Sequence, residues 1–136
     1  MNYQLDRGAY PPERAHKEDA GLDLRTPHGF VLNPGDSIVI NTGIHVEIPF
    51  GQVGFLKSKS GLNVRYGITS EGVIDSGYTG AIRCKLYNHG RNTKVFEAGD
   101  KITQLVILPV IIDDPVQVDY ISGSDRGDAG FGSTGR

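Results

Sequence analysis

Apolar and polar residues alternate along much of this chain with a period of two, the period of a β-strand that buries one face. The alternation is clearest in Ile44–Ile48 (Ile-His-Val-Glu-Ile) and in Ile82–Tyr87 (Ile-Arg-Cys-Lys-Leu-Tyr). Shorter candidates of the same kind are Ser37–Ile40, Val53–Lys57, Val73–Ile74, Lys94–Phe96 and Thr103–Val110. The pattern therefore predicts a protein built mainly from short strands.

Clusters of turn-forming residues separate these stretches. They are Asn33–Asp36, Pro49–Gly51, Ser76–Gly77, Asn88–Gly90 and Ala98–Asp100. Many short strands with such turns between them indicate an all-β sandwich or barrel. One short helix of about two turns is expected at Ser60–Tyr66, with Ser60 as its N-cap and Gly67 just beyond its end.

The composition changes at the end of the chain. Residues 122–136 contain five glycines and one large apolar side chain, Phe131, so this segment cannot build a core of its own. It is either a frayed terminus or a flexible arm that orders on a ligand or on another subunit. We therefore divide the chain into a β domain, residues 1–121, and a glycine-rich C-terminal arm, residues 122–136.

Length, composition and charge narrow the class further. A chain of 136 residues fits one domain, and 19 glycines are about twice the average share, which disfavours a helical bundle. The net charge of −2 lacks the basic excess typical of duplex-binding proteins, so we expect no nucleic-acid partner. The longest strongly apolar run, Leu105–Ile112, contains Pro109 and is too short to span a bilayer, so we expect no membrane partner.

Cys84 is the only cysteine, so a disulfide within the chain is excluded and a reducing, cytoplasmic environment is expected. This residue is either a small buried hydrophobe or a thiol activated by the neighbouring Arg83 and Lys85. Alternation on a strand sends both basic side chains to the opposite face, which favours the buried thiol.

The arm carries groups that suit a phosphate chain. Arg126, backbone amides freed by glycines, and the adjacent hydroxyls of Ser133 and Thr134 are typical of phosphate sites, and Phe131 offers a flat face to a base. Ser133 stands where a Walker A loop requires lysine, so this is not a P-loop. The alternative interpretation is a solvated linker.

Two internal segments are also candidates. Lys57–Gly61 places basic side chains and hydroxyls before the predicted helix, which suits an anion, although this segment by itself favours a solvated loop with an ordinary helix cap. In Gly72–Gly80, Asp75 sits where a strand meets a turn, three residues before Tyr78. Asp75 is either a turn residue or a general base toward water.

Asp23 lies between two leucines and is expected to be buried. A buried carboxylate needs a partner, either an arginine or a hydrated metal, and a structural ion pair is an equal alternative. The four histidines show no metal-ligand spacing, and together with Cys84 they do not suggest a zinc site.

Each of these segments is ambiguous by itself, but their order is not. In sequence they resemble the five motifs of trimeric deoxyuridine triphosphatases, the dUTPase or dUTP diphosphatase family. The matching segments are Asp19–Leu24, Lys59–Leu62, Gly72–Gly80, Gly99–Leu105 and Arg126–Gly135. The resemblance covers nearly the whole chain, and the third and fifth motifs are its specific parts.

The resemblance implies a jelly-roll-like β domain with one short helix and a flexible arm that closes over the nucleotide. It also implies a homotrimer with sites at the subunit interfaces. The implied reaction converts dUTP and water to dUMP and diphosphate, with Mg²⁺ on the triphosphate. This activity would keep uracil out of DNA and supply dUMP for thymidylate synthesis.

The resemblance further implies a role for each site residue. Asp75 would activate the attacking water and hold the 3′-hydroxyl, and Tyr78 would leave no room for a ribose 2′-hydroxyl. Asp23 would support the metal–phosphate region indirectly, since no direct protein ligand to the metal is expected. The substrate-binding residues would be Lys59, Ser60, Gly61, Thr69, Val73, Ile74, Tyr78, Arg83, Gln104, Arg126, Phe131, Gly132, Ser133 and Thr134.

The chain departs from the family pattern at four positions. Lys59 and Lys101 stand where arginine is frequent, Thr69 where an asparagine often assists uracil recognition, and Ala129 where glycine is frequent. Lysine keeps the charge but loses the planar, bidentate fork of arginine. None of these changes removes a group that the chemistry requires.

Three other functions compete with this interpretation. The related deoxycytidine triphosphate deaminases carry a glutamate where Lys85 stands here, which argues against deamination. A phage-type dUTPase that regulates a host partner would be favoured by a long insertion between the motifs, and none is present. A nucleotide-binding trimer without catalysis is disfavoured by the presence of Asp75.

Overall fold

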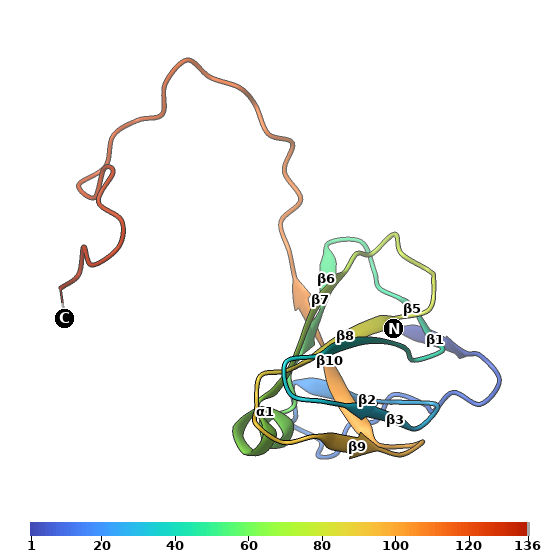
Figure 1. Cartoon of the computed structure of the whole chain (residues 1–136). Coiled ribbons are helices and arrows are strands. Elements are labelled where there is room, and N and C mark those ends of the chain that lie inside the picture. The colour runs from blue at the N-terminus through green and yellow to red at the C-terminus, as the bar shows by residue number, and fades with distance from the viewer. Residues whose placement is uncertain (136) are drawn as a thin grey trace.

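The computed structural model describes residues 1–135 and consists of ten strands and one short helix (Figure 1). The elements are β1 (Asn2–Leu5), β2 (Gly21–Arg25), β3 (Phe30–Leu32), β4 (Ser37–Asn41), β5 (Ile44–Glu47), β6 (Gln52–Lys57), α1 (Ser60–Tyr66), β7 (Ile68–Ile74), β8 (Arg83–Asn88), β9 (Lys94–Phe96) and β10 (Lys101–Pro109). The prediction of an all-β, jelly-roll-like domain with one short helix is confirmed.

The strands form one large sheet and two small ones. The six-stranded sheet has the order β2-β10-β6-β7-β8-β4, while β1 pairs with β5 and β3 pairs with β9. Every pairing is antiparallel. The sheets curl around a shared core, and strands far apart in sequence become neighbours (Figure 1).

Alternating side chains of the strands fill the core, as the period of two predicts. In β8, Cys84 and Leu86 are buried, while Arg83 and Lys85 are exposed on the other face. Burial raises the pKa of the Cys84 thiol to about 11, so the thiol stays protonated at neutral pH. The interpretation of Cys84 as a buried hydrophobe is confirmed.

The helix has the predicted bounds, but its predicted N-cap is wrong. Lys59, which has extended backbone angles, is the N-cap, and its carbonyl accepts the first helical hydrogen bond from the Asn63 N–H at 2.9 Å. Ser60 is therefore the first helical residue, and no side chain caps the helix. Gly67 ends the helix in the left-handed region with φ of 67°, as expected for a residue without a Cβ.

Three strands were not expected from the sequence, and one is longer than expected. The residues of β1 are mostly exposed, so their pairing with β5 leaves no alternation in the sequence. In β2, the inward-facing Asp23 interrupts the apolar pattern, and β3 has only three residues. β7 extends back to Ile68, well before the expected Val73–Ile74.

Regular structure ends with β10 at Pro109. Residues 110–135 belong to no helix or strand and project away from the sheets (Figure 1). Several apolar side chains in this stretch are exposed, namely Val110, Ile111, Ile112, Val116, Val118, Tyr120, Ile121 and Phe131. Arg136, the last residue of the arm, lies outside the described residues.

Within residues 1–135, no helix has both the length and the apolar character needed to cross a membrane.

Candidate active site

The hairpin between β7 and β8 brings five of the sequence-predicted residues together around one cavity. The cavity has a volume of about 220 Å³. Its lining residues are Val73, Ile74, Asp75, Tyr78 and Arg83. Val73 and Ile74 end β7, and Arg83 begins β8, so the two paired strands fix the walls while the connecting turn supplies the acid and the aromatic ring.

Local contacts hold Asp75 and Tyr78 in a compact turn. The Tyr78 N–H donates to the Asp75 carbonyl at 3.0 Å, and the Tyr78 hydroxyl donates to the Ala81 carbonyl at 2.9 Å. The ring lies so close to Gly80 that a Cβ there would approach the ring carbon Cζ to 2.7 Å. Glycine at position 80 is therefore required for this placement of the ring. Asp75 and Tyr78 are both exposed and accessible to a ligand.

A second group of predicted residues gathers around Asp23 in β2. Asp23 is 7% exposed, and its carboxylate pairs with Lys59 through Oδ1 and with Lys101 through Oδ2, the latter at 2.8 Å. Burial alone would raise the pKa of Asp23, but hydrogen bonds from Lys101 and Lys59 outweigh it and hold the pKa below its usual value. The partners of the buried acid are therefore lysines, as in the structural ion pair, and not an arginine.

The ion pairs continue outward from this centre. Lys101 also lies 3.7 Å from Glu13, and Glu13 pairs with Arg25 at 2.6 Å. The hydrogen bond to Asp23 raises the pKa of Lys101. Because Asp23 holds its ammonium group, Lys59 presents a fixed positive charge beside the start of α1.

Gln104, Ser60 and Gly61 lie in the same region. Gln104 in β10 is opposite Asp23 in β2, and its side-chain Nε2 donates to the Ser58 carbonyl at 3.0 Å. Ser60 and Gly61 are exposed in the first turn of α1, where amide groups lack helical partners. Together with Lys59, these groups could bind a phosphate chain.

Thr69 lies outside the hairpin cavity. Its Oγ1 is 3.1 Å from Nε2 of His89, and it borders a different cavity of about 400 Å³ that also includes Tyr87 and Ser58. Within one chain, the structure therefore does not bring Thr69 to the hairpin cavity.

The register of β6 and β7 separates the hairpin from the lysine cluster. Gly54 is opposite Ile74 at the hairpin end, and Lys57 is opposite Glu71 toward α1. At a rise of about 3.3 Å per residue, the four residues from Glu71 to Asp75 span roughly 13 Å. The two groups thus lie at opposite ends of the same pair of strands.

The arm residues form a third group. Arg126, Phe131, Gly132, Ser133 and Thr134 border, with Gly130, a hollow of about 430 Å³ within the arm itself. Arg126 Nε donates to the Ala129 carbonyl at 2.8 Å, and the Phe131 ring is fully exposed. This part of the chain stands away from the sheets (Figure 1).

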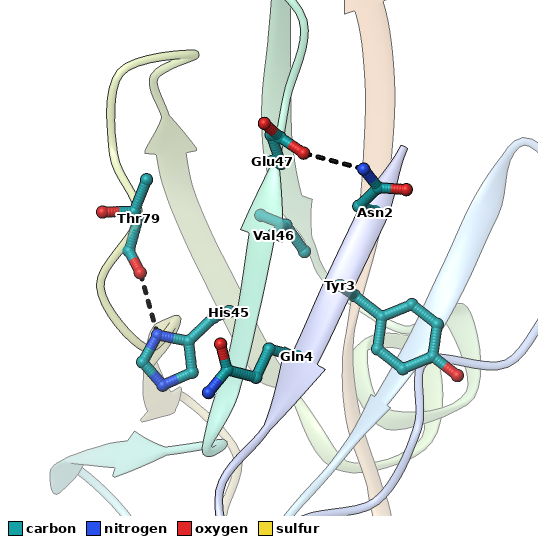
Figure 2. Close-up of a pocket in the computed structure, with 7 residues that line it drawn as sticks. All are labelled: Asn2, Tyr3, Gln4, His45, Val46, Glu47 and Thr79. Carbon is teal, nitrogen blue, oxygen red and sulfur yellow. Dashed lines mark hydrogen bonds between the residues drawn. The ribbon is translucent and has the colours of Figure 1, made fainter.

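One residue near the hairpin was missed by the sequence analysis. His45 in β5 hydrogen-bonds to the Thr79 carbonyl within the hairpin turn (Figure 2). Alternation in β5 indicates that this side chain points away from the core. Thr79 follows His45 by 34 residues, and nothing in the sequence indicates that the two residues meet in the fold.

Across residues 1–135, no group of three or more His, Cys, Asp or Glu side chains is placed to hold a metal ion. Both oxygens of Asp23, the acid considered as a metal contact, are engaged by lysine.

The dUTPase family model matches residues 8–135 of this chain. A deoxyuridine 5′-triphosphate nucleotidohydrolase of Tropheryma whipplei is 43% identical over 136 residues, covering 97% of this chain and 93% of the relative. The enzyme of the same description from Gloeothece citriformis is 39% identical over 135 residues with the same coverage.

Solved structures of dUTPases are also similar. The dUTPase of Staphylococcus bacteriophage 80alpha with dUPNHPP superposes with a TM-score of 0.93 at 32% identity, covering 99% of this chain and 98% of that one. A mutant dUTPase from phage phi11 of S. aureus, described with a coordinated structural Mg(II) ion, has a TM-score of 0.80 at 31% identity and covers 88% and 98% of the two chains.

Proposed function

Because the chain belongs to the dUTPase family, we propose that its hairpin cavity binds the deoxyuridine of dUTP and that Asp75 activates the attacking water. The protein is a dUTP diphosphatase, which hydrolyses dUTP to dUMP and diphosphate. The observation that carries the assignment of the site is the single cavity shared by Val73, Ile74, Asp75, Tyr78 and Arg83. The reaction removes a precursor of uracil in DNA and supplies dUMP for thymidylate synthesis.

A diphosphate-release assay with dUTP, dCTP, dTTP and UTP side by side tests this function. We expect rapid release from dUTP, because in this proposal the backbone of Val73 and Ile74 contacts the uracil edge and the Tyr78 ring excludes a ribose. Equal rates with dCTP would contradict the proposed base recognition. Ammonia release from dCTP would instead indicate a deaminase, although that reaction lacks its glutamate here because Lys85 occupies the position.

The proposed chemistry places water in line with the phosphate and stabilises the charge that develops there. Asp75 takes the proton of the water as general base. The triphosphate is contacted by Lys59, whose ammonium is positioned by Asp23, by the free amides of Ser60 and Gly61, and by Gln104. Fixed donors aimed at phosphate oxygens are effective because they need no reorganisation during the reaction.

Mg²⁺ is proposed to enter with the triphosphate as part of the substrate. When bound, it supplies Lewis-acid stabilisation of the phosphate oxygens. The role of Asp23 is then indirect, because its two oxygens hold Lys59 and Lys101. A reaction in the cytoplasm accords with a single, reduced cysteine.

The arm is proposed to complete the site. Arg126 would contact phosphate, Phe131 would cover the uracil, and Gly132, Ser133 and Thr134 would close on the terminal phosphate. In the structure these groups surround a common hollow and their polar atoms are exposed, so they are available to a ligand.

A homotrimer with shared sites is proposed because one chain does not unite the three groups. The hairpin cavity and the lysine cluster lie at opposite ends of β6 and β7, and the arm stands away from both (Figure 1). Exposed apolar residues such as Ile111, Val116 and Ile121 also need cover. Assembly of subunits would satisfy both requirements.

Light scattering is expected to give a mass of about three times 14.7 kDa. Subunits carrying D75N, refolded together with subunits lacking the arm, should then recover activity, because some sites would combine an intact hairpin with an intact arm. Each variant refolded alone serves as the control. A fully active monomer would contradict the shared site.

Tyr78→Ala is expected to raise UTP hydrolysis relative to dUTP by about tenfold or more, because removing the ring opens space for the 2′-hydroxyl. The ratio of kcat/KM for the two nucleotides measures this effect. Y78F, which keeps the ring and removes only the hydroxyl bonded to Ala81, is the matched control. An unchanged ratio in Y78A would place sugar discrimination elsewhere.

A further inference from the structure

His45 connects the turn of the hairpin to the N-terminal part of the fold. It lies in β5 between the buried Ile44 and Val46 and points to the opposite side (Figure 2). Its Nδ1 is 2.8 Å from the Thr79 carbonyl oxygen, and its Nε2 is 3.1 Å from Oδ1 of Asp6. The imidazole therefore bridges the hairpin and a carboxylate that follows β1.

The Asp6 side of this bridge is firmly placed. The Asp6 N–H donates to the Gly43 carbonyl at 2.8 Å, in the turn that leads into β5. Gly43 has φ of 67°, and a Cβ there would meet Ala9 Cβ at 2.8 Å and Asp6 Cβ at 3.3 Å. The segment carrying Asp6 is thus packed against the β5 turn, so it can serve as an anchor for the ring.

The Thr79 side of the bridge leads directly to the substrate-discriminating ring. Thr79 lies between Tyr78 and Gly80, on which the Tyr78 ring packs. In the described part of the chain, the other hydrogen bonds of residues 75–81 run within the turn itself, from the Tyr78 amide to Asp75 and from the Tyr78 hydroxyl to Ala81. Main-chain bonds to Ile44 and Thr42 hold the next residue, Ile82, and the His45 bond ties residues 75–81 themselves to the rest of the described chain.

We propose that His45, anchored by Asp6, is a positioning residue that holds the Thr79 carbonyl and thereby fixes Tyr78 for discrimination between deoxyribose and ribose. This inference rests on the role proposed above for Tyr78. It adds a specificity determinant that touches neither the substrate nor the attacking water.

The protonation state of His45 determines how many of these contacts it makes. An imidazolium donates from both nitrogens, to Thr79 and to Asp6. A neutral ring has one N–H, and the stronger, charge-assisted bond to the Asp6 carboxylate holds that proton on Nε2, which leaves Nδ1 without a proton for the Thr79 carbonyl. The hydrogen bond to the Thr79 carbonyl and the bond to Asp6 raise the pKa of His45 above its ordinary value of 6.5.

Asp6 is the carboxylate that pairs with the His45 ring. Glu47, two residues along β5, is turned to Asn2 of β1 at 2.8 Å, and the residue paired with His45 in β1 is the neutral Gln4 (Figure 2). The hairpin offers a main-chain carbonyl. The bridge is thus complete below pH 6.5 and is lost as the pH rises through the raised pKa.

The experiment measures the ratio of kcat/KM for dUTP over UTP in three variants. H45A removes both contacts, H45Q can reach Asp6 but not Thr79, and H45N retains a donor near the position of Nδ1. We expect H45A and H45Q to lower the ratio about fivefold, as for one lost hydrogen bond, and H45N to remain within about twofold of the parent. H28A, a change at an exposed histidine in the turn after β2, is the control and should not alter the ratio.

The pH dependence of the kcat/KM ratio is a second test, because a purely structural role of His45 would not change the ratio with pH. Ionisations that affect the hydrolysis of both nucleotides equally cancel in the ratio. The parental ratio should therefore fall as the pH rises above 6.5, while the ratio of H45N stays flat. A parental ratio independent of pH would overturn the role of the imidazolium.

The outcomes separate this inference from the function on which it rests. If Y78A lowers the ratio and H45A and H45Q do not, the inference about His45 is wrong while the role of Tyr78 stands. If Y78A leaves the ratio unchanged, Tyr78 does not discriminate between the sugars, and the inference about His45 is wrong as well. Amide exchange of residues 76–81 should be faster in H45A than in H45N, and equal exchange would overturn the positioning contact.

Discussion

Replacing Asp75 with asparagine is expected to lower dUTP turnover by about 10²–10⁴-fold, the usual contribution of a general base. The change keeps the size of the side chain and removes its ability to accept the proton of the water. Because Asp75 is exposed in a turn held by main-chain bonds, the fold and much of the nucleotide binding should survive. Steady-state diphosphate release measures turnover, and calorimetry with a non-hydrolysable dUTP analogue measures binding.

Asp36→Asn provides a matched control for this change. Asp36 is another exposed aspartate in a turn, between β3 and β4, outside the hairpin cavity. Its replacement should leave turnover near the parental rate. Hydrolysis by D75N at near that rate would show that another group, or the metal-bound substrate itself, activates the water.

Deleting residues 126–136 is expected to lower turnover by at least about 100-fold while leaving a folded β protein. The described residues of this segment are exposed and follow the last strand, so their removal uncovers no core. Their proposed contribution arises when Arg126, Phe131, Ser133 and Thr134 close over the nucleotide. Exclusion of bulk water from the reacting phosphate would be lost with them.

Limited proteolysis with and without the dUTP analogue tests the same closure. Ordering about eleven residues costs on the order of 1–2 kcal/mol of backbone entropy each, and only a highly charged ligand is expected to offset this. The arm should therefore be cleaved readily in the free protein and be protected in the complex. Equal cleavage in both states, or full activity after truncation, would identify this segment as a frayed terminus.

The strands that bury one face were predictable, and those defined by pairing were not. Alternation is sufficient for β8, where Cys84 and Leu86 face the core, and glycine chemistry is sufficient for the end of α1 at Gly67. β1 is recognisable only by its antiparallel pairing with β5, a tertiary relation that leaves no periodic signal in the four residues of the strand.

The site shows the same division. Asp75 and Tyr78 are close in sequence, so their shared cavity follows from a short hairpin. The lysine partners of Asp23 were not predicted, because Lys59 comes from the N-cap of α1 and Lys101 from β10, both far from Asp23 in the sequence. Similarly, His45 contacts Thr79 only because β5 lies beside the hairpin in the folded chain. Long-range pairing, not residue type, determines these contacts.

The burial of Cys84 has a practical consequence for observing the arm. A fully covered thiol with a pKa of about 11 should resist maleimide reagents under native conditions. A cysteine introduced elsewhere can therefore be labelled selectively without first replacing Cys84. A fluorophore attached through Gly123→Cys, just ahead of the proposed binding residues, would report arm closure in real time during single turnovers.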